Sequence, residues 1–250
     1  MNDESVTALG VDPCEGLGLV DTGTGWIPPS IPAYCEETYW WAYLHPRSVW
    51  LFEREWVVNL ILWGNMHRLT DAVLDELAEP LSAPVLQVAC VYGDFSRRLA
   101  QHTRQLGRRL HLVDVAPIQL ENARRKLAGQ EVIFHHQDST CLQFAGGTFE
   151  RTVVFFLLHE QPAEARRESI AEALRVTRRG GKAVFVDYHQ PHRANPLRYF
   201  MHPVLKTLEP FAHDLWQRDL VQWLPPGIAP ERVHSQLYAG GLYQKVVVDC

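Results

Sequence analysis

The 250-residue sequence lacks a strongly basic segment, a long apolar run and paired cysteines. Its formal net charge of −5 argues against nucleic acid as a partner. The longest apolar stretch, residues 56–64, contains Asn59 and is too short to span a bilayer. The five cysteines show no CxxC spacing, which favours reduced thiols and a cytoplasmic location. These observations leave the class of water-soluble or membrane-surface-bound proteins. The 46% apolar composition is enough to form one sizeable hydrophobic core.

Three regions follow one another along the chain. Residues 1–35 are rich in glycine, proline, aspartate and threonine without periodicity, which predicts a flexible arm. Residues 36–83 are helical in pattern and predict an N-terminal helical cover, with Pro46 near a helix start. One apolar stripe is expected to run through Val49, Phe52, Trp56, Leu60 and Trp63. Residues 84–250 predict one α/β domain, interrupted over 190–230 by a proline-rich, aromatic insertion.

Strands and helices alternate in the third region. Apolar runs predict strands over 85–91, 109–114, 131–135, 151–157 and 182–188, with helices over 95–106, 117–128 and 162–177. Residues 178–181 are typical of a turn that ends a helix. Residues 236–238 and 243–248 predict a closing hairpin. The expected architecture is a doubly wound sheet, mostly parallel, with an antiparallel last strand.

The segment from Val85 to Asp94 is the most informative part of the chain. An apolar strand leads into a turn and a helix, and the next strand ends at Asp114. This is the layout of nucleotide-binding domains, in which ligands lie beyond the carboxyl ends of the strands. The turn keeps only Gly93, while Val91 and Tyr92 occupy positions where bare backbone normally approaches the ligand. We therefore expect an unusual backbone path and an unusual cofactor pose.

Five segments in order resemble the class I S-adenosylmethionine-dependent methyltransferases, a Rossmann-like fold, and most of all those that methylate quinone precursors. They are VLQVACVYGD, LVDVAPIQLENARRKL, FHHQDST, FERTVVFFLLHE and ALRVTRRGGKAVFVDYH, within residues 84–189. This resemblance implies a cofactor site formed by Gln87, Ala89, Val91, Tyr92, Gly93, Asp114, Val115, Asp138 and Ser139. Gln87 stands where the pattern has an acidic residue, Asp114 keeps the ribose position, and Asp138 with Ser139 keeps the adenine position. The alternative is a degenerate turn that binds nothing.

A narrower resemblance covers nearly the whole chain. The segments YWWAYLHPRSVWLFEREWVVNLILWGNMHRL, VACVYGDFS and GGLYQKVVV are similar to the rhodoquinone biosynthesis family RquA. That resemblance implies an enzyme that aminates ubiquinone to rhodoquinone, with S-adenosylmethionine as amino donor and manganese (Mn²⁺) assisting. Two alternatives remain, namely methylation of a quinone or small molecule and a non-catalytic S-adenosylmethionine-binding protein of quinone biosynthesis.

Two predicted strands end in residues suited to metal binding or acid–base chemistry. Neighbouring strands of a doubly wound sheet should bring these ends together beside the cofactor. Carboxylates with imidazoles suit manganese, so the candidate metal ligands are Glu160, Asp187 and His189. The alternative has Asp187 as a helix cap and His159 as an ordinary strand-end histidine. The candidate catalytic residues are Tyr92, Asp94 and His159.

Aromatic residues crowd the predicted cover and the insertion. Amphipathic aromatic side chains favour an interface, which predicts peripheral contact with the inner membrane surface, where ubiquinone would be collected. The cover contributes Trp40, Trp41, Trp50, Trp56 and Trp63. The insertion around Tyr199 and Phe200 is expected to act as a lid. The alternative is that both segments simply pack on the sheet.

Overall fold

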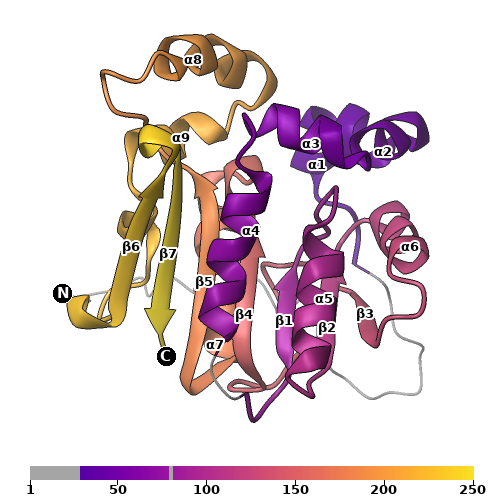
Figure 1. Ribbon diagram of the computed structural model, residues 1–250. Coiled ribbons are helices and arrows are strands. Elements are labelled where there is room, and N and C mark those ends of the chain that lie inside the picture. Colours follow the sequence, from indigo (N-terminus) through magenta and orange to yellow (C-terminus); the bar gives the residue numbers. More distant parts are fainter. Residues whose placement is uncertain (1–28, 79–80) are drawn as a thin grey trace, which may run out of the picture.

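A seven-stranded sheet forms the centre of the protein in a computed structural model, which describes residues 29–78 and 81–250 (Figure 1). The strand order is β3-β2-β1-β4-β5-β7-β6. The first five strands are parallel, and β7 is antiparallel to both β5 and β6. The strands are β1 Val85–Val88, β2 Leu110–Asp114, β3 Val132–His136, β4 Phe149–Phe155, β5 Thr177–Tyr188, β6 Val233–Tyr238 and β7 Tyr243–Asp249. The predicted fold class is confirmed.

Helices cover both faces of the sheet because its central strands are apolar on both sides. Alternate residues of β1 point to opposite faces, so Val85 belongs to one core cluster and Leu86 to the other. The first cluster is completed by α4 Met66–Leu74, α5 Phe95–Gln105 and α6 Pro117–Lys126. The second is completed by α7 Ala163–Val176, behind the sheet in Figure 1. Helices α5, α6 and α7 lie close to their predicted bounds.

The N-terminal cover differs from its prediction at one break. Its elements are α1 Ala33–Thr38, η1 Trp40–Leu44, α2 Pro46–Phe52 and α3 Glu55–Ile61. Pro46 starts α2 as predicted, but Arg54 adopts an extended conformation between α2 and α3. The helical register therefore does not continue across the break. Val49 is buried, whereas Trp56, Leu60 and Trp63 are exposed, so the predicted apolar stripe does not keep one face across the break.

The insertion contains α8 Leu197–Leu208, α9 Ala212–Gln217, η4 Leu220–Trp223 and η5 Pro230–Arg232. In Figure 1, α8 lies at the same end of the molecule as α1 to α3. This is the end at which the parallel strands finish. Two segments far apart in sequence thus frame the region where α/β folds bind ligands.

The predicted turn at residues 178–181 is part of β5 instead. The Gly180 N–H donates to the Cys250 carbonyl and the Cys250 N–H donates to the Gly181 carbonyl, so this segment pairs with the end of β7. A Cβ at Gly181 would lie 2.5 Å from the Glu150 carbonyl oxygen. Glycine is required here by close packing and not by a helix end. Its role could not be distinguished from sequence alone.

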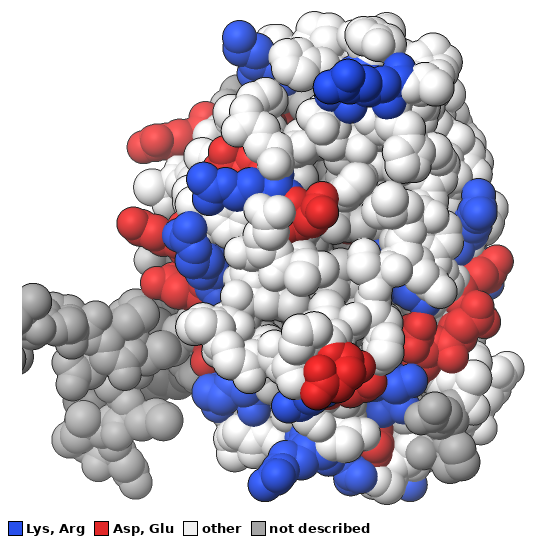
Figure 2. Space-filling model, turned by 90° about the vertical axis from the view of Figure 1, so that its left-hand side faces the viewer, with Lys and Arg blue, Asp and Glu red and all other residues white. Residues whose placement is uncertain are grey.

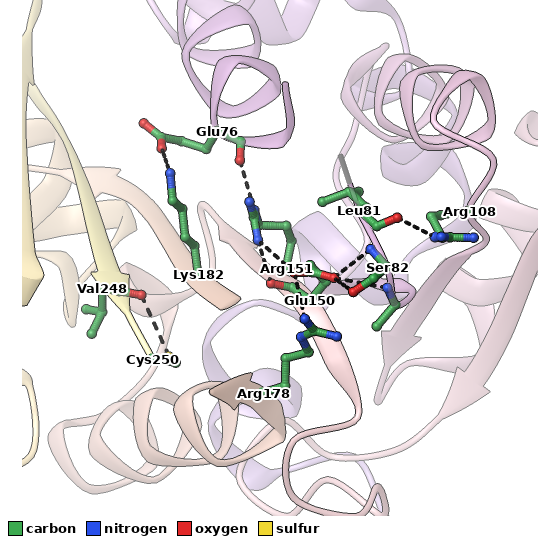
Figure 3. A network of polar contacts seen from close by, with 11 residues as sticks. Glu76, Leu81, Ser82, Arg108, Glu150, Arg151, Arg178, Lys182, Val248 and Cys250 are labelled. Atoms are coloured by element: carbon green, nitrogen blue, oxygen red, sulfur yellow. Dashed lines mark hydrogen bonds and ion pairs between the residues drawn. The ribbon is translucent and has the colours of Figure 1, made fainter. Parts of the chain in front are cut away.

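A polar network at the opposite end of the sheet fixes the cover to the strands (Figure 3). Glu76 of η2 Asp75–Leu77 forms ion pairs with Lys245 at 2.6 Å and Lys182 at 3.5 Å. Burial opposes ionisation of Glu76, but the two lysines hold its pKa below the usual value. Glu150 accepts hydrogen bonds from the backbone and hydroxyl of Ser82. The chain between η2 and β1 is therefore held at both ends.

Two further expectations concern thiols and membranes. Cys35, Cys90 and Cys250 are free thiols, whereas Cys141 is disulfide-bonded, which corrects the expectation of reduced thiols throughout. Across residues 29–78 and 81–250, no helix combines the length and hydropathy needed to cross a membrane. Most of the predicted arm, residues 1–28, lies outside the described residues, and residues 33–38 form α1.

Candidate functional site

A cavity of about 630 Å³ lies at the carboxyl ends of β1, β2, β4 and β5. Its walls come from the turn after β1, the end of β2, the loop after β3 and the loop after β4, and it is covered by η1, α3 and α8. The cavity includes the point where the strand order reverses, between β1 and β4. Its size lies within the roughly 300–1,000 Å³ typical of small-molecule sites.

Left-handed backbone conformations concentrate around this cavity. Four non-glycine residues of the described chain have positive φ, and three of them, Trp63, Ala89 and Phe156, line the cavity. Such conformations cost energy and occur often at ligand sites. The left-handed conformation in the turn after β1 falls on Ala89, with φ of +71°, and Val91 does not adopt it.

The predicted cofactor residues divide into two groups. Those that line the cavity are Ala89, Val91, Tyr92, Asp114, Val115 and Ser139. Those that do not are Gln87, Gly93 and Asp138. The Gln87 side chain braces the turn, because its amide donates to the Ala89 carbonyl and the Ser96 hydroxyl. Asp138 accepts from Thr140 in a local turn, so its prediction as a direct cofactor contact is not supported.

Asp114 links the turn to the second strand. Its Oδ2 accepts from the Cys90 N–H at 2.7 Å, and its Oδ1 accepts from the Ala116 N–H at 2.8 Å. Burial raises the pKa of Asp114 although both N–H groups stabilise the carboxylate. An ionised carboxylate offers about four acceptor positions. Asp114 therefore keeps acceptor capacity for ligand hydroxyl groups on the cavity side.

Tyr92 is held by the N-terminal cover. Its hydroxyl donates to the Ala42 carbonyl at 2.8 Å and accepts from the Gln119 side chain at 2.6 Å. Burial raises the pKa of the phenol. Since its hydroxyl is already engaged, Tyr92 shapes the cavity and does not present a free proton donor to it. The predicted catalytic role of Tyr92 stays a prediction.

Asp94, the second candidate catalytic residue, is engaged in a local ion pair. It stands at the N-terminal cap of α5 and forms an ion pair with Arg97, one turn along the helix. It is absent from the cavity wall. The structure therefore gives no support to a catalytic role for Asp94, whose side chain makes no cap hydrogen bond to α5 and pairs with Arg97 instead.

The third candidate, His159, belongs to a buried acid–base cluster. In η3 Leu158–Glu160, the His159 Nδ1 lies 2.9 Å from Asp187 Oδ1 and its Nε2 lies 3.6 Å from Glu160 Oε1. The Tyr43 hydroxyl donates to Glu160. His159 and Glu160 line the cavity together with Tyr43 and Glu209. The site thus joins a strand-end histidine to a carboxyl group and to a phenol of the cover.

The charges of this cluster depend on burial and mutual contact. Burial alone would lower the pKa of His159, but Asp187 outweighs it and raises the pKa. Burial raises the pKa of Glu160, and the nearby imidazole counteracts only part of that rise. Burial and Glu160 together raise the pKa of Tyr43. These groups can hold and release protons within a closed, mostly apolar space.

The three candidate metal ligands are not gathered. The Asp187 Oδ2 accepts from the N–H groups of Leu158 and His159, which makes Asp187 a cap of η3. His189 instead contacts the Gly241 carbonyl at 2.7 Å and Asp219 at 2.9 Å. No group of three or more His, Cys, Asp or Glu side chains in the described part of the chain could hold a metal ion. The residues do not fit manganese, and the capping alternative explains Asp187.

Several site residues were not identified from sequence. Tyr43 lies in the crowded aromatic segment, Gln119 in a helix, and Glu209 in the insertion. Tyr43 and Glu160 are 117 positions apart. The one available signal was the cluster of aromatic residues in the cover, which does not reveal which of them points inward.

Comparison with known proteins agrees with this architecture. The family model described as "Methyltransferase domain" matches residues 85–181. Demethylmenaquinone methyltransferase of Beutenbergia cavernae is 30% identical over 181 residues, which cover 67% of this chain and 70% of the relative.

Solved structures show the same fold. The N-methyltransferase NodS of Bradyrhizobium japonicum has a TM-score of 0.52 at 16% identity, over 73% of this chain and 94% of its own. The S-adenosylmethionine-dependent methyltransferase SibL has a TM-score of 0.54 at 22% identity, over 75% and 57% of the two chains. The chain therefore belongs to the class I S-adenosylmethionine-dependent methyltransferase family.

Proposed function

We propose that this chain is an enzyme that converts ubiquinone into rhodoquinone, with S-adenosylmethionine as the amino donor. Its family uses this cofactor, and a relative at 30% identity is named for its action on demethylmenaquinone. The resemblance of the cover, the turn and the terminal hairpin to the rhodoquinone biosynthesis family supports the finer assignment. The observation that most supports amination is the unusual turn after β1. Ala89 has a left-handed conformation there, and the Tyr92 hydroxyl is bound to the N-terminal cover.

The cavity residues fit S-adenosylmethionine better than they fit a metal ion. Asp114 keeps acceptor positions suited to ribose hydroxyls, and Ser139 lines the wall near Val115 and Ala116, where the adenine end would lie. No step is derived for manganese, because the described residues supply no ligand set for it.

Bound S-adenosylmethionine would supply the amino nitrogen, and the quinone ring carbon that accepts it would lose its methoxy group as methanol. The bond between this nitrogen and Cα of the cofactor would then break by hydrolysis, with the two electrons of the Cα–H bond passing to the quinone ring and the cofactor leaving as its 2-oxo acid. The protein must then move protons, because the attacking amine loses one and the leaving methoxy group gains one. Glu160 and His159 border the cavity and contact each other, so they are the groups placed to exchange protons with a ligand there. Asp187 orients the imidazole from behind.

Methylation of a quinone is the second candidate, favoured by the named activity of the Beutenbergia cavernae relative. An S-adenosylmethionine that carries ¹⁵N in its amino group and ¹³C in its methyl group separates the two reactions. We expect mass spectrometry to find ¹⁵N, and no ¹³C, in a product that has lost one methoxy group. Incorporation of ¹³C would establish methylation instead, and cofactor binding without any labelled product would establish the non-catalytic alternative. Parallel reactions with a chelator and with added manganese measure whether a metal is required.

A further inference from the structure

Large apolar side chains are exposed at the end of the molecule that holds the cavity. We define the aromatic rim as Trp50, Trp56, Leu60, Trp63, Tyr199 and Phe200. These side chains are between 40% and 69% exposed. They come from α2, α3, the turn that follows α3, and α8, and these helices lie at the same end of the molecule in Figure 1. Monomeric proteins rarely expose contiguous apolar patches of this kind without a partner.

The aromatic rim is continuous with the cavity. Leu60, Trp63 and Phe200 are exposed to solvent and also line the cavity wall. Trp63 packs edge-on against Phe200, with ring centroids 5.5 Å apart, and its indole N–H contacts the Met201 sulfur at 3.2 Å. The rim therefore surrounds the mouth of the cavity, between the cover and the insertion.

The charges around the rim are mainly basic. Residues 46–63 and 193–206 contain five Arg or Lys residues and two Glu residues, in a chain whose net charge is −5. Glu53 forms an ion pair with Lys126, and Glu55 lies 3.1 Å from the His67 imidazole. The Arg54 guanidinium lies 4.0 Å from the centre of the Trp50 ring. Figure 2 shows the flank formed by β6 and α8, where the uppermost charged side chains are basic.

We propose that the aromatic rim docks on an anionic lipid bilayer, so that the cavity mouth faces the membrane. Apolar and aromatic side chains would enter the headgroup region, and the surrounding cations would contact acidic headgroups. The proposal that the rim docks on a membrane depends only on the exposed side chains and charges of the rim. The consequence that a lipid-tailed quinone passes directly between α3 and α8 rests on the proposed function.

Vesicle co-sedimentation of the full chain tests the docking, with no quinone or cofactor present. We expect binding to vesicles that contain phosphatidylglycerol, weaker binding to pure phosphatidylcholine and a decrease with added salt. The variant Trp50→Ser/Trp56→Ser/Tyr199→Ser removes rim side chains that do not line the cavity. It should lower vesicle affinity by about tenfold or more. The matched control, Val221→Ser/Leu237→Ser, removes exposed apolar side chains elsewhere and should bind as the parent does.

Equal affinity of the rim variant and the parent, with both folded by circular dichroism, would overturn the proposal. A parent dimer that becomes monomeric in the rim variant, without any change in lipid binding, would assign the rim to a second copy of the chain. A short-tailed quinone in detergent separates this inference from the proposed function. The rim variant should still aminate that substrate, and it should fail only with quinone embedded in vesicles.

Discussion

Tyr43 and Tyr92 are stacked face to face, with ring centroids 5.7 Å apart and planes inclined by 7°. One ring belongs to the N-terminal cover and the other to the turn after β1. The Gln119 side chain joins them further, because it donates to the Tyr43 carbonyl and to the Tyr92 hydroxyl. The stack closes the turn from above and brings the Tyr43 hydroxyl to Glu160. The cover is therefore part of the site.

Tyr43→Phe should lower kcat by roughly a hundredfold, the lower end of the range attributed to single acid–base groups. The substitution removes the hydrogen bond to Glu160 and keeps the ring that stacks on Tyr92. Binding of S-adenosylmethionine, measured by calorimetry, should change little. Tyr238→Phe removes an exposed hydroxyl on β6 and serves as the control. An unchanged kcat for Tyr43→Phe would exclude the phenol from proton exchange.

Asp114→Asn should weaken S-adenosylmethionine binding by about tenfold, because a neutral amide replaces the charged acceptor that meets the ribose hydroxyls. Asp94→Asn is the matched control, since Asp94 pairs with Arg97 outside the cavity. Calorimetric titration of both variants gives the comparison. If Asp94→Asn weakened binding as much as Asp114→Asn, the assignment of the two aspartates would be wrong.

Ala89→Gly should stabilise the fold by about 1 kcal/mol, because glycine adopts the positive φ of this position without steric cost. Urea unfolding of the variant measures the change. Ala100→Gly, in the interior of α5, should have the opposite sign and cost about 1 kcal/mol or more. A destabilised Ala89→Gly variant would show that the left-handed conformation is not the source of strain.

Arg166→Met should destabilise the fold by roughly 2–4 kcal/mol, because three carbonyl groups lose a charged donor. The fully buried guanidinium donates to the carbonyls of Leu158, Gln161 and Phe211. It thereby holds η3, which carries His159 and Glu160, to α7 and α9. Thermal unfolding measures the loss, and the exposed Arg124→Met is the control. Equal stability of parent and Arg166→Met would mean that the three carbonyls find other donors.

The stacked pair His111 and His135 should make the fold sensitive to mild acid. Their rings are 5.1 Å apart, and burial together with the neighbouring imidazole lowers the pKa of His111 to about 4. The folded state thus binds fewer protons than the unfolded state, where the pKa is about 6.5. Stability should be complete above pH 6.5 and should fall as the pH drops from there towards 4. Urea unfolding at pH 7.5, 6 and 5 measures the fall, and His111→Phe should reduce its slope.

The core fold was predictable because its signals are local. Apolar runs bounded by turn residues located β1 to β5, and Asp114 at a strand end marked the ligand edge. The sequence patterns gave wrong predictions where contacts with segments distant in the chain determine the structure. The local sequence of residues 178–181 predicts a turn, but these residues join β5 because the end of β7 pairs with them. The position of Asp187 at a strand end predicts a metal ligand, but its carboxylate accepts hydrogen bonds from the N–H groups of η3. Tyr43 becomes a site residue only when the cover folds over the turn.

The ion pair between Glu76 and Lys245 joins positions 169 residues apart. On the ribosome, the helix that precedes Glu76 emerges long before the strand that carries its buried cationic partner. Until synthesis reaches that strand, Glu76 has only the more distant Lys182 as a cationic partner, and α4 has an incomplete surface against which to pack. The junction of cover and sheet is therefore completed only when β7 joins the sheet, and nascent chains halted before residue 245 should remain sensitive to protease there.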